Sequence, residues 1–277
     1  MYRWPAVGLR CVYTDLDGTL LGHHGSLFRD ADGAFSLMQA RALEACHRAG
    51  AEVVIMSGRR EAQVMADARL LGQTSYIYEA GCGVVIEGER TFLTGDWIPD
   101  DEGTPADRMI REGIPGLLFA RFPERLEWHR PWHKDRVLSH LFRGRVDVDA
   151  ANEVLALHGH DDLRFLDNGA IVRPMDGLDG PAHAYHLVPG GASKAKAVAW
   201  HGRARGYEPS ECIAVGDSIE DLDSAEAVGR FFVVANGPER DPGLREAIAG
   251  RANVTVTEGR NGDGVYEAVV STLAQRE

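Results

Sequence analysis

Short strand-like runs alternate with helical stretches at both ends of the chain, and this alternation constrains the fold more than any other feature. The strand-like runs lie at 9–14, 52–56, 76–78, 212–215 and 230–234. The helical stretches lie at 35–49, 59–71, 193–205, 219–227 and 242–249. Strands that alternate with helices in this way predict an α/β fold, in which helices cover a parallel sheet.

The middle of the chain has a different pattern, which we interpret as an inserted α+β module. Its hairpin-like runs lie at 83–87 and 90–93, its amphipathic helix at 148–157, and two further strands at 163–166 and 170–173, on either side of a turn at 167–169. The length of the chain fits two domains. We therefore predict a discontinuous core, 1–86 and 188–277, with an insertion at 87–187.

The acidic balance of the chain limits its partners. With 30 Lys and Arg against 42 Asp and Glu, the 277 residues carry a formal net charge of −12, which argues against general binding to nucleic acid or an anionic membrane. No run has the length of a transmembrane helix, and residues 1–5 lack the apolar segment of a signal peptide. Cys11, Cys46, Cys82 and Cys212 are far apart and form no Cys-x-x-Cys pair, so the pattern favours neither a zinc nor a redox site and fits the cytoplasm best.

Two carboxylates follow the first strand-like run directly, in Asp15-Leu16-Asp17-Gly18-Thr19. Ligands of open α/β sheets bind at the carboxyl ends of the strands, and Gly18 permits a turn that would aim both carboxylates at one pocket. One acid could then act as nucleophile and the other as general acid and base, or both could hold a hard cation. Turn chemistry alone also selects Asp and Gly after a strand, so both interpretations stay open.

Two helix starts carry groups that suit an anion. Ser57-Gly58-Arg59 follows the second strand-like run, and a hydroxyl with backbone N–H groups at a helix start suits a phosphate oxygen, although a serine N-cap needs no ligand. The charge of Lys194 opposes the dipole of the helix that it begins, which indicates an anionic partner; a solvated surface lysine is the alternative.

A further acidic cluster, Gly216-Asp217-Ser218-Ile219-Glu220-Asp221, follows the strand-like run at 212–215. Asp217 offers a carboxylate to a metal, and Asp221 lies one helical turn further on. Acidic residues in a first helical turn also satisfy the helix dipole with no metal present.

These four clusters stand in the order Asp-x-Asp-x-Thr, Ser, Lys and Gly-Asp-x-x-x-Asp. In this order and placement the chain resembles the phosphatases of the haloacid dehalogenase (HAD) superfamily, over residues 1–86 and 188–277. The resemblance implies a Rossmann-like core and hydrolysis of a phosphate ester through an aspartyl-phosphate. The acid at Asp17 resembles the phosphatase and phosphomutase branches, because the dehalogenase and phosphonatase branches lack it.

The resemblance also implies roles for single residues. Asp15 would be the nucleophile, and Asp17 would protonate the leaving oxygen and then activate water. Lys194 would neutralise Asp15 and the phosphate. Substrate binding would fall to Thr19, Ser57, Gly58 and Arg59, with Thr19 also supporting the turn.

Mg²⁺ is the cofactor that the resemblance implies, held by the Asp15 carboxylate, the Asp17 carbonyl and Asp217. Octahedral oxygen coordination and the pairing of carboxylates with phosphate suit this ion. Ser218 and Asp221 would support the site from outside the metal's ligands. Glu220 departs from the family pattern, since relatives often have Asn at its position.

The insertion between Ser57 and Lys194 narrows the resemblance to members with an α+β cap after the third strand. These are the Cof-type sugar phosphatases, sucrose-phosphate phosphatases, mannosyl-3-phosphoglycerate phosphatases and phosphomannomutases. The cap segment 121–145 is rich in Arg and carries interleaved Trp. We expect Arg125 and Arg130 to bind a second anionic or polyhydroxylated part of the substrate, with a solvated face or a dimer contact as the alternative.

The combined prediction is a Mg²⁺-dependent phosphomonoester hydrolase that acts on a small phosphorylated metabolite, a sugar phosphate or a glycosyl-phosphoglycerate. A phosphomutase and a catalytically silent sugar-phosphate-binding protein are the alternatives. No nucleic acid or membrane partner is expected, and the sequence predicts no oligomeric state.

Overall fold

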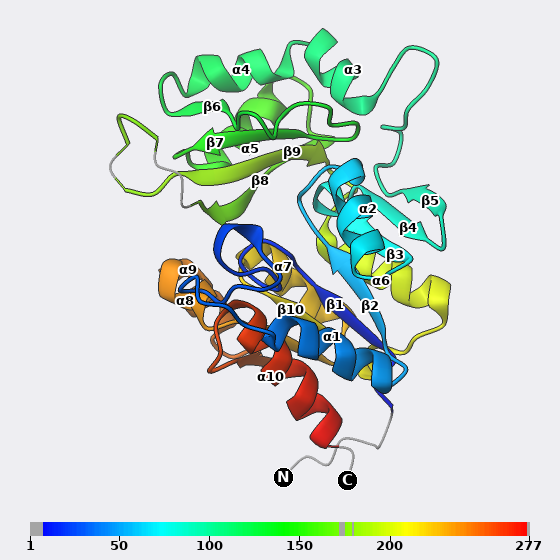
Figure 1. The fold of residues 1–277 in the computed structure, drawn as a ribbon. Coiled ribbons are helices and arrows are strands. Elements are labelled where there is room, and N and C mark those ends of the chain that lie inside the picture. The colour runs from blue at the N-terminus through cyan, green and yellow to red at the C-terminus, as the bar shows by residue number, and fades with distance from the viewer. Residues whose placement is uncertain (1–7, 172–174, 179, 276–277) are drawn as a thin grey trace.

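The chain forms two sheets that lie one above the other in Figure 1. We describe them from a computed structural model, which covers residues 8–171, 175–178 and 180–275. The residues 1–5 that enter the signal-peptide prediction lie outside these. Across the described ranges, none of the helices has the length and apolar character needed to span a membrane.

The larger sheet has eight strands in the order β12-β11-β10-β1-β2-β3-β4-β5. Their bounds are β1 Cys11–Thr14, β2 Glu52–Met56, β3 Ser75–Tyr78, β4 Gly83–Ile86, β5 Glu89–Phe92, β10 Cys212–Gly216, β11 Arg230–Val233 and β12 Val254–Val256. The strands from β12 to β3 are parallel, and β4 and β5 add an antiparallel hairpin at one edge. The central strands are almost wholly apolar because helices cover both faces.

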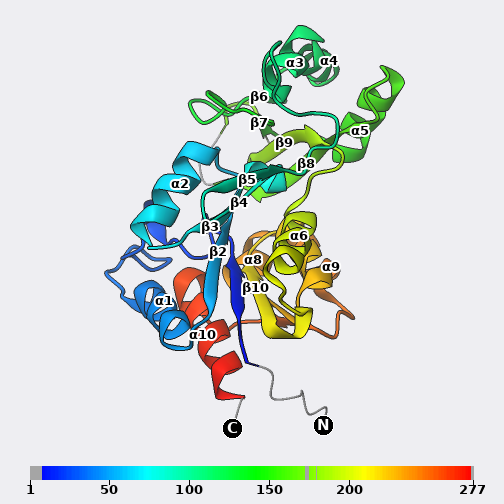
Figure 2. The ribbon, with the colours of Figure 1, turned by 90° about the vertical axis from the view of Figure 1, so that its right-hand side faces the viewer.

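Helices of different segments cover the two faces of this sheet (Figure 2). On one face lie α1 Met38–Arg48, α2 Glu61–Leu70 and α10 Asn261–Ala274. On the other lie α6 Lys194–Arg205, α7 Ile219–Leu222 and α9 Pro242–Ile248, with the short α8 Asn236–Arg240 before α9. Single 3-10 turns occur at His23–Gly25, Glu79–Gly81, Pro209–Glu211 and Asp223–Ala227.

The smaller sheet belongs to the middle of the chain and is antiparallel, in the order β6-β7-β9-β8. Its strands are β6 Leu126–Trp128, β7 His140–Gly144, β8 Leu163–Ala170 and β9 His183–Pro189. The helices α3 Pro105–Arg111, α4 Ile114–Arg121 and α5 Val148–Leu157 cover the face that points away from the larger sheet (Figure 1). The opposite face of the smaller sheet is thereby left to face the larger one, and we refer to this middle part as the cap and to the rest as the core.

The predicted fold class is confirmed: a mostly parallel α/β sheet with an α+β insertion. The hairpin-like runs predicted for the insertion belong instead to the core sheet, which continues through β5 to Phe92, and the cap sheet ends at Pro189.

The predicted turn at 167–169 is wrong. β8 runs through it as one strand whose register shifts between Asp167 and Ala170, because Gly169, at φ 92°, absorbs the irregularity. Residues 172 and 173 of the strand predicted at 170–173 lie outside the described residues.

Candidate active site

The carboxyl ends of three adjacent strands meet at the edge of the core sheet that faces the cap. Asp15 follows β1, Ser57 follows β2 and Asp217 follows β10, and these strands are neighbours in the order β10-β1-β2. Lys194, the first residue of α6, reaches the same place. The parallel register thus brings together groups that are up to 202 positions apart in the chain.

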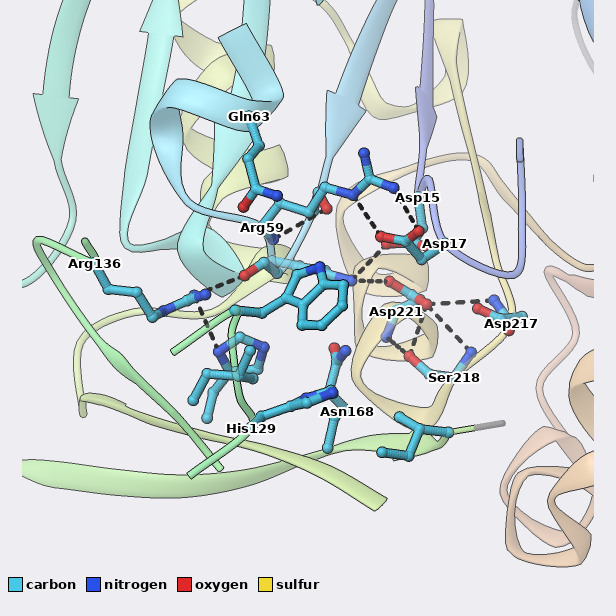
Figure 3. A pocket seen from close by; sticks show the side chains of 18 residues that line it. Asp15, Asp17, Arg59, Gln63, His129, Arg136, Asn168, Asp217, Ser218 and Asp221 are labelled. Atoms are coloured by element: carbon cyan, nitrogen blue, oxygen red, sulfur yellow. Dashed lines mark hydrogen bonds and ion pairs between the residues drawn. The ribbon is translucent and has the colours of Figure 1, made fainter. Parts of the chain in front are cut away.

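A cavity of about 240 Å³ lies between this edge and the cap (Figure 3). Its core lining consists of Asp15, Asp17, Ser57, Gly58, Arg59, Gln63, Lys194, Asp217, Ser218 and Asp221. Its cap lining consists of His129, Trp132, Arg136, Leu141, Asn168, Ile171, Ala184 and His186. A larger cavity of about 590 Å³ adjoins it and shares Asp17, Asn168, Ile171, Asp217 and Ser218.

Lys194 is the electrostatic centre of the site. Its ammonium is 1% exposed and donates to Asp15 Oδ1 at 2.9 Å and to Asp221 Oδ1 at 2.7 Å. Burial acts to lower the pKa of Lys194, but the attraction of Asp15, Asp221 and Glu220 outweighs it and raises that pKa well above its usual value. Lys194 therefore stays charged throughout the physiological pH range.

Negative charge nevertheless exceeds positive charge around this lysine. Burial raises the pKa of Asp15 well above its ordinary value, against the opposing effect of Lys194. Burial and the neighbouring Asp221 raise the pKa of Asp217 to about 6. One carboxyl oxygen from each of Asp15, Asp217 and Asp221 lies within 4.8 Å of the other two, so a cation at this point would relieve their repulsion.

Asp221 and Ser218 are hydrogen-bonded to each other. Ser218 caps α7, its hydroxyl donates to Asp221 Oδ2 at 2.7 Å, and its backbone N–H donates to the same oxygen at 3.2 Å. Since Lys194 occupies the other oxygen of Asp221, both oxygens are already engaged. Asp217 is oriented differently, by the hydroxyl of the buried Thr19 at 3.2 Å and by Arg240 at 3.0 Å.

The guanidinium of Arg59 is hydrogen-bonded to the carboxylate of Asp17. Its Nε and Nη2 donate to the two carboxylate oxygens of Asp17 at 2.7 and 2.6 Å, and Nη1 donates to Asp67 at 2.7 Å. Although burial acts to lower the pKa of Arg59, these two carboxylates raise it above its ordinary value. The sequence predicts Arg59 as a substrate-binding residue, whereas this geometry gives its guanidinium two protein partners already.

Ser57 and Gly58 line the cavity on its core side, and Gly58 lies against the cap. Ser57 is 1% exposed, and its hydroxyl accepts from the Arg59 backbone N–H at 3.2 Å. A Cβ added at Gly58 would stand 2.6 Å from His186 Nε2 of the cap. A glycine is therefore required for this close approach.

Glu220 is the one carboxylate near Lys194 with no compensating hydrogen bond among the described residues. It is 9% exposed, its oxygens have no hydrogen-bond partner, and the closer one lies 3.8 Å from Lys194 Nζ. Burial raises the pKa of Glu220 to about 7, although Lys194 opposes the shift.

The cap contributes Arg136, which belongs to the predicted Arg-rich segment 121–145, together with Asn168 and His186, which the sequence did not predict. Arg136 follows β6, Asn168 lies on β8 and His186 on β9, and all three point into the cavity, with the Arg136 Nη2 within 3.4 Å of His186 Nδ1. Burial lowers the pKa of His186 well below its usual range, so this imidazole is neutral. Arg125 and Arg130, which the sequence does predict, are exposed and are not among the described residues that line either cavity.

A buried joint holds the cap segment that carries Arg136. Glu79, fully buried after β3, accepts from the backbone N–H groups of Val137 and Leu138 at 3.0 Å and from the Ser139 hydroxyl at 2.7 Å. Arg136 donates in turn to the Gly58 carbonyl at 2.7 Å and lies 3.9 Å from Glu79. The backbone at this joint is left-handed at Glu79, at φ 47°, and at the next residue, Ala80, at φ 57°.

Comparison with known proteins shows similarity to phosphatases. No protein-family model matches the chain. The chain is 30% identical to a phosphoglycolate phosphatase of Halorubrum lacusprofundi, over 84% of this chain and 86% of that protein. The sucrose-phosphatase of Synechocystis has a similar structure, with 14% identity, a TM-score of 0.65 and coverage of 95% and 97%. A HAD-superfamily phosphatase of Bacteroides thetaiotaomicron does too, with 17% identity, a TM-score of 0.65 and coverage of 98% and 97%.

Proposed function

The chain belongs to the phosphatases of the haloacid dehalogenase superfamily, and from this premise we propose that it hydrolyses a small phosphomonoester with Asp15 as nucleophile and Mg²⁺ as cofactor. The observation that carries the proposal is the buried contact of Lys194 with Asp15 and Asp221. A fixed ammonium holds the nucleophile in place and attracts the phosphate that it attacks.

Two displacements at phosphorus make up the reaction. Lys194 occupies Asp15 Oδ1, so the other oxygen of Asp15 forms the bond to phosphorus while the ester P–O bond breaks. Asp17 donates a proton to the leaving oxygen and then accepts one from the water that attacks the aspartyl-phosphate. Hydrolysis releases phosphate and restores the Asp15 carboxylate.

The carboxylates at this edge fit the cation that the proposal requires. Asp15 and Asp217 would hold Mg²⁺ together with the Asp17 carbonyl, whereas Asp221 stays with Lys194 and Ser218. When bound, Mg²⁺ neutralises charge on the phosphate oxygens and orients the phosphoryl group. Thr19 and Arg240 would set the direction of Asp217.

Arg59 is best assigned to positioning Asp17 in its ionised form, which is the form that accepts a proton from water. A bidentate guanidinium contact fixes the plane of a carboxylate better than a lysine can. Since the side chain of Asp17 is 56% exposed, this contact is what limits its motion at the mouth of the cavity. Ser57 is left to bind a phosphoryl oxygen.

The size and chemistry of the cavity support a small, polar leaving group. A volume of about 240 Å³ is below that of most drug-sized sites. Asn168 and the neutral His186 offer hydrogen bonds suited to the hydroxyls of a sugar phosphate, and Trp132 offers a flat face. 2-Phosphoglycolate is a second candidate, favoured by the name of the Halorubrum relative.

Asp15→Asn tests the assignment of the nucleophile. We expect the variant to lose at least about 10⁴-fold in kcat with either substrate class, because a neutral amide cannot form the aspartyl-phosphate. The exposed Asp101→Asn serves as the control and should retain wild-type kcat. Near-normal turnover by a folded Asp15→Asn protein would refute the assignment.

Product analysis separates hydrolysis from phosphomutase activity. Incubation with a hexose phosphate and with 2-phosphoglycolate, each with Mg²⁺, should release inorganic phosphate. Exchange of the phosphate between positions of the hexose, without release, would instead identify a mutase.

A further inference from the structure

The strands that carry the candidate active site bear a second cluster of reactive side chains at their opposite ends. Cys11, Glu52 and Cys212 are the first residues of β1, β2 and β10, and both Cys212 and Glu52 are register partners of Cys11. His201 of α6 covers them on the face where Tyr13 also lies. This end of the sheet points away from the cap (Figure 1).

The side chains of this cluster are within coordinating distance of one another. A ligand atom from each of Cys11, Glu52 and His201 lies within 4.8 Å of the other two. Cys11 and His201 are fully buried, and Glu52 is 14% exposed. Cys212, also buried, is the register partner of Cys11 on the adjacent strand, so a second sulfur is available beside this group.

His201 has one ring nitrogen in use and one without a partner. Its Nδ1 lies 2.9 Å from the Tyr13 hydroxyl, whereas Nε2 is buried with no hydrogen-bond partner and is 3.8 Å from Glu52 Oε1. A buried ring nitrogen without a partner is costly. A metal-binding histidine shows this same division, with one nitrogen held by a polar group and the other directed at the ion.

Glu52 is held as an anion beside this nitrogen. It accepts from Ser75 at 2.6 Å, from Tyr207 at 2.7 Å and from Arg205 at 3.1 Å. Burial acts to raise the pKa of Glu52, but the nearby His201 and the hydrogen bonds from Ser75 and Tyr207 outweigh it and lower that pKa to about 2. The cluster therefore keeps a carboxylate at neutral pH, and that carboxylate is already oriented.

We propose that Cys11, Glu52 and His201 bind a zinc ion, with the adjacent Cys212 as the fourth ligand. Sulfur, imidazole and carboxylate together suit zinc, whereas Mg²⁺ takes oxygen ligands. Binding displaces the thiol protons to solvent and leaves thiolates on the metal. With four protein ligands and no open position the site is structural, and it ties β1, β2, β10 and α6 together at the end remote from the cavity.

The spacing of the cysteines along the chain does not indicate a zinc site. Cys11 and Cys212 are 201 positions apart, and no short-range motif joins them. They become neighbours only because β1 and β10 pair in parallel with these two residues in register.

Cobalt substitution gives a direct test, because a sulfur ligand to Co²⁺ produces a near-ultraviolet charge-transfer band. The full chain is freed of metal with a chelator, returned to excess Mg²⁺ and titrated with Co²⁺. We expect the band to saturate at about one Co²⁺ per chain and to disappear when Zn²⁺ is added. No cysteine is among the described residues that line the active-site cavity, so the band cannot arise there.

Two variants and a matched control locate the site. Cys11→Ser should give a weaker band, because one of the two sulfur ligands is removed, and His201→Gln should weaken Co²⁺ binding. Cys46→Ser, which changes a buried cysteine of α1 on the other face of the sheet, should keep the full band and the wild-type affinity for Co²⁺. Zn²⁺ at about 100 times its Kd should raise the Tm of the wild-type protein and of Cys46→Ser by roughly 5 °C, but not that of Cys11→Ser.

The wild-type protein keeps the test decisive even if Cys11→Ser does not fold. Absence of a sulfur-to-cobalt band in the folded wild-type chain, or equal bands in Cys46→Ser and His201→Gln at every Co²⁺ concentration, would overturn the proposal. In either case the cluster would be a hydrogen-bonded network that stabilises the core without a metal.

Discussion

The core and the cap build their halves of the cavity in different ways. The core half comes from the ends of parallel strands and the start of α6, and it is rich in carboxylates around a single buried ammonium. The cap half comes from a segment between strands and from antiparallel strands, and it has amide, indole, imidazole and apolar side chains with a single guanidinium, that of Arg136. We infer that the core half supplies charge for phosphoryl transfer, while the cap half selects the leaving group by shape and hydrogen bonding.

The hydrogen bonds that the cap donates to Glu79 connect the two halves, so a change at Glu79 should affect this comparison most. Glu79→Gln removes the charge that faces the buried Arg136 and weakens the acceptor for three cap donors. Loss of one partner of a buried ion pair costs about 3 kcal/mol in free energy of unfolding. Urea denaturation monitored by circular dichroism measures this loss.

The half-exposed Glu127→Gln is the matched control, because Glu127 pairs with Arg143 inside the cap alone. We expect a change below about 1 kcal/mol for it. Equal losses in the two variants would show that the core and the cap do not depend on Glu79 for their connection.

The core half of the site could be predicted from the sequence because its residues follow strand ends. Parallel strands bring their carboxyl ends to one edge, so a short motif after each apolar run already indicates a shared location. Asp15, Ser57, Lys194 and Asp217 do meet there. The contact of Arg59 with Asp17 was beyond such reasoning, because it depends on the direction of one side chain and not on its position along the chain.

The cap half could not be predicted in this way. The richness in Arg of 121–145 indicated Arg125 and Arg130, which lie on either side of β6, whereas Arg136 of the same segment lines the cavity. Composition marks a segment and does not identify which of its side chains face the site. Asn168 enters the cavity from a strand that the sequence divided at a turn, so its direction depends on the bulge beside Gly169. The residue that anchors Arg136 lies in the core, 57 positions earlier.

The variant Glu220→Gln tests whether the excess negative charge of the core half lowers the free energy of unfolding. The pKa of Glu220 is raised by folding from its usual 4.5 to about 7, so the folded state binds the proton more tightly than the unfolded state. Its contribution to the free energy of unfolding therefore falls as the pH rises from about 4.5 to about 7, and then stays constant. Glu220→Gln should stabilise the metal-free protein by about 3 kcal/mol at pH 8 and by close to zero at pH 4.

Urea denaturation in a chelating buffer at pH 4 and pH 8 measures this difference. The exposed Glu226→Gln, six residues further on, should change the free energy of unfolding equally at both pH values. A pH-independent effect of Glu220→Gln would mean that Lys194 holds this carboxylate ionised at no cost.

Substitutions of Asn168 and Arg125 should differ in their effect on substrate binding by the cap. Asn168 points into the cavity and Arg125 is exposed, so Asn168→Ala should raise the KM of the preferred substrate by about tenfold, the effect of about 1.4 kcal/mol, while Arg125→Ala leaves it unchanged. With p-nitrophenyl phosphate, which lacks a polar leaving group of this kind, both variants should resemble wild type. A raised KM in Arg125→Ala alone would favour the basic segment over the cavity lining as the specificity determinant.

The exposed ion pair between Arg60 and Asp135 connects the core to the cap, as Glu79 does. Of the contacts considered, we expect it to contribute least to the free energy of unfolding. The Asp135 side chain is 77% exposed, and an exposed pair is offset by side-chain entropy and screened by salt. A double-mutant cycle of Arg60→Ala and Asp135→Asn, read by urea denaturation, should give a coupling of about 0.5 kcal/mol that fades in 1 M salt. Because Arg60 is adjacent to Arg59 but touches neither Asp17 nor the cavity among the described residues, kcat should stay within about twofold of wild type. A coupling near that expected for Glu79 would mean that the surface, and not the buried carboxylate, holds the cap over the core.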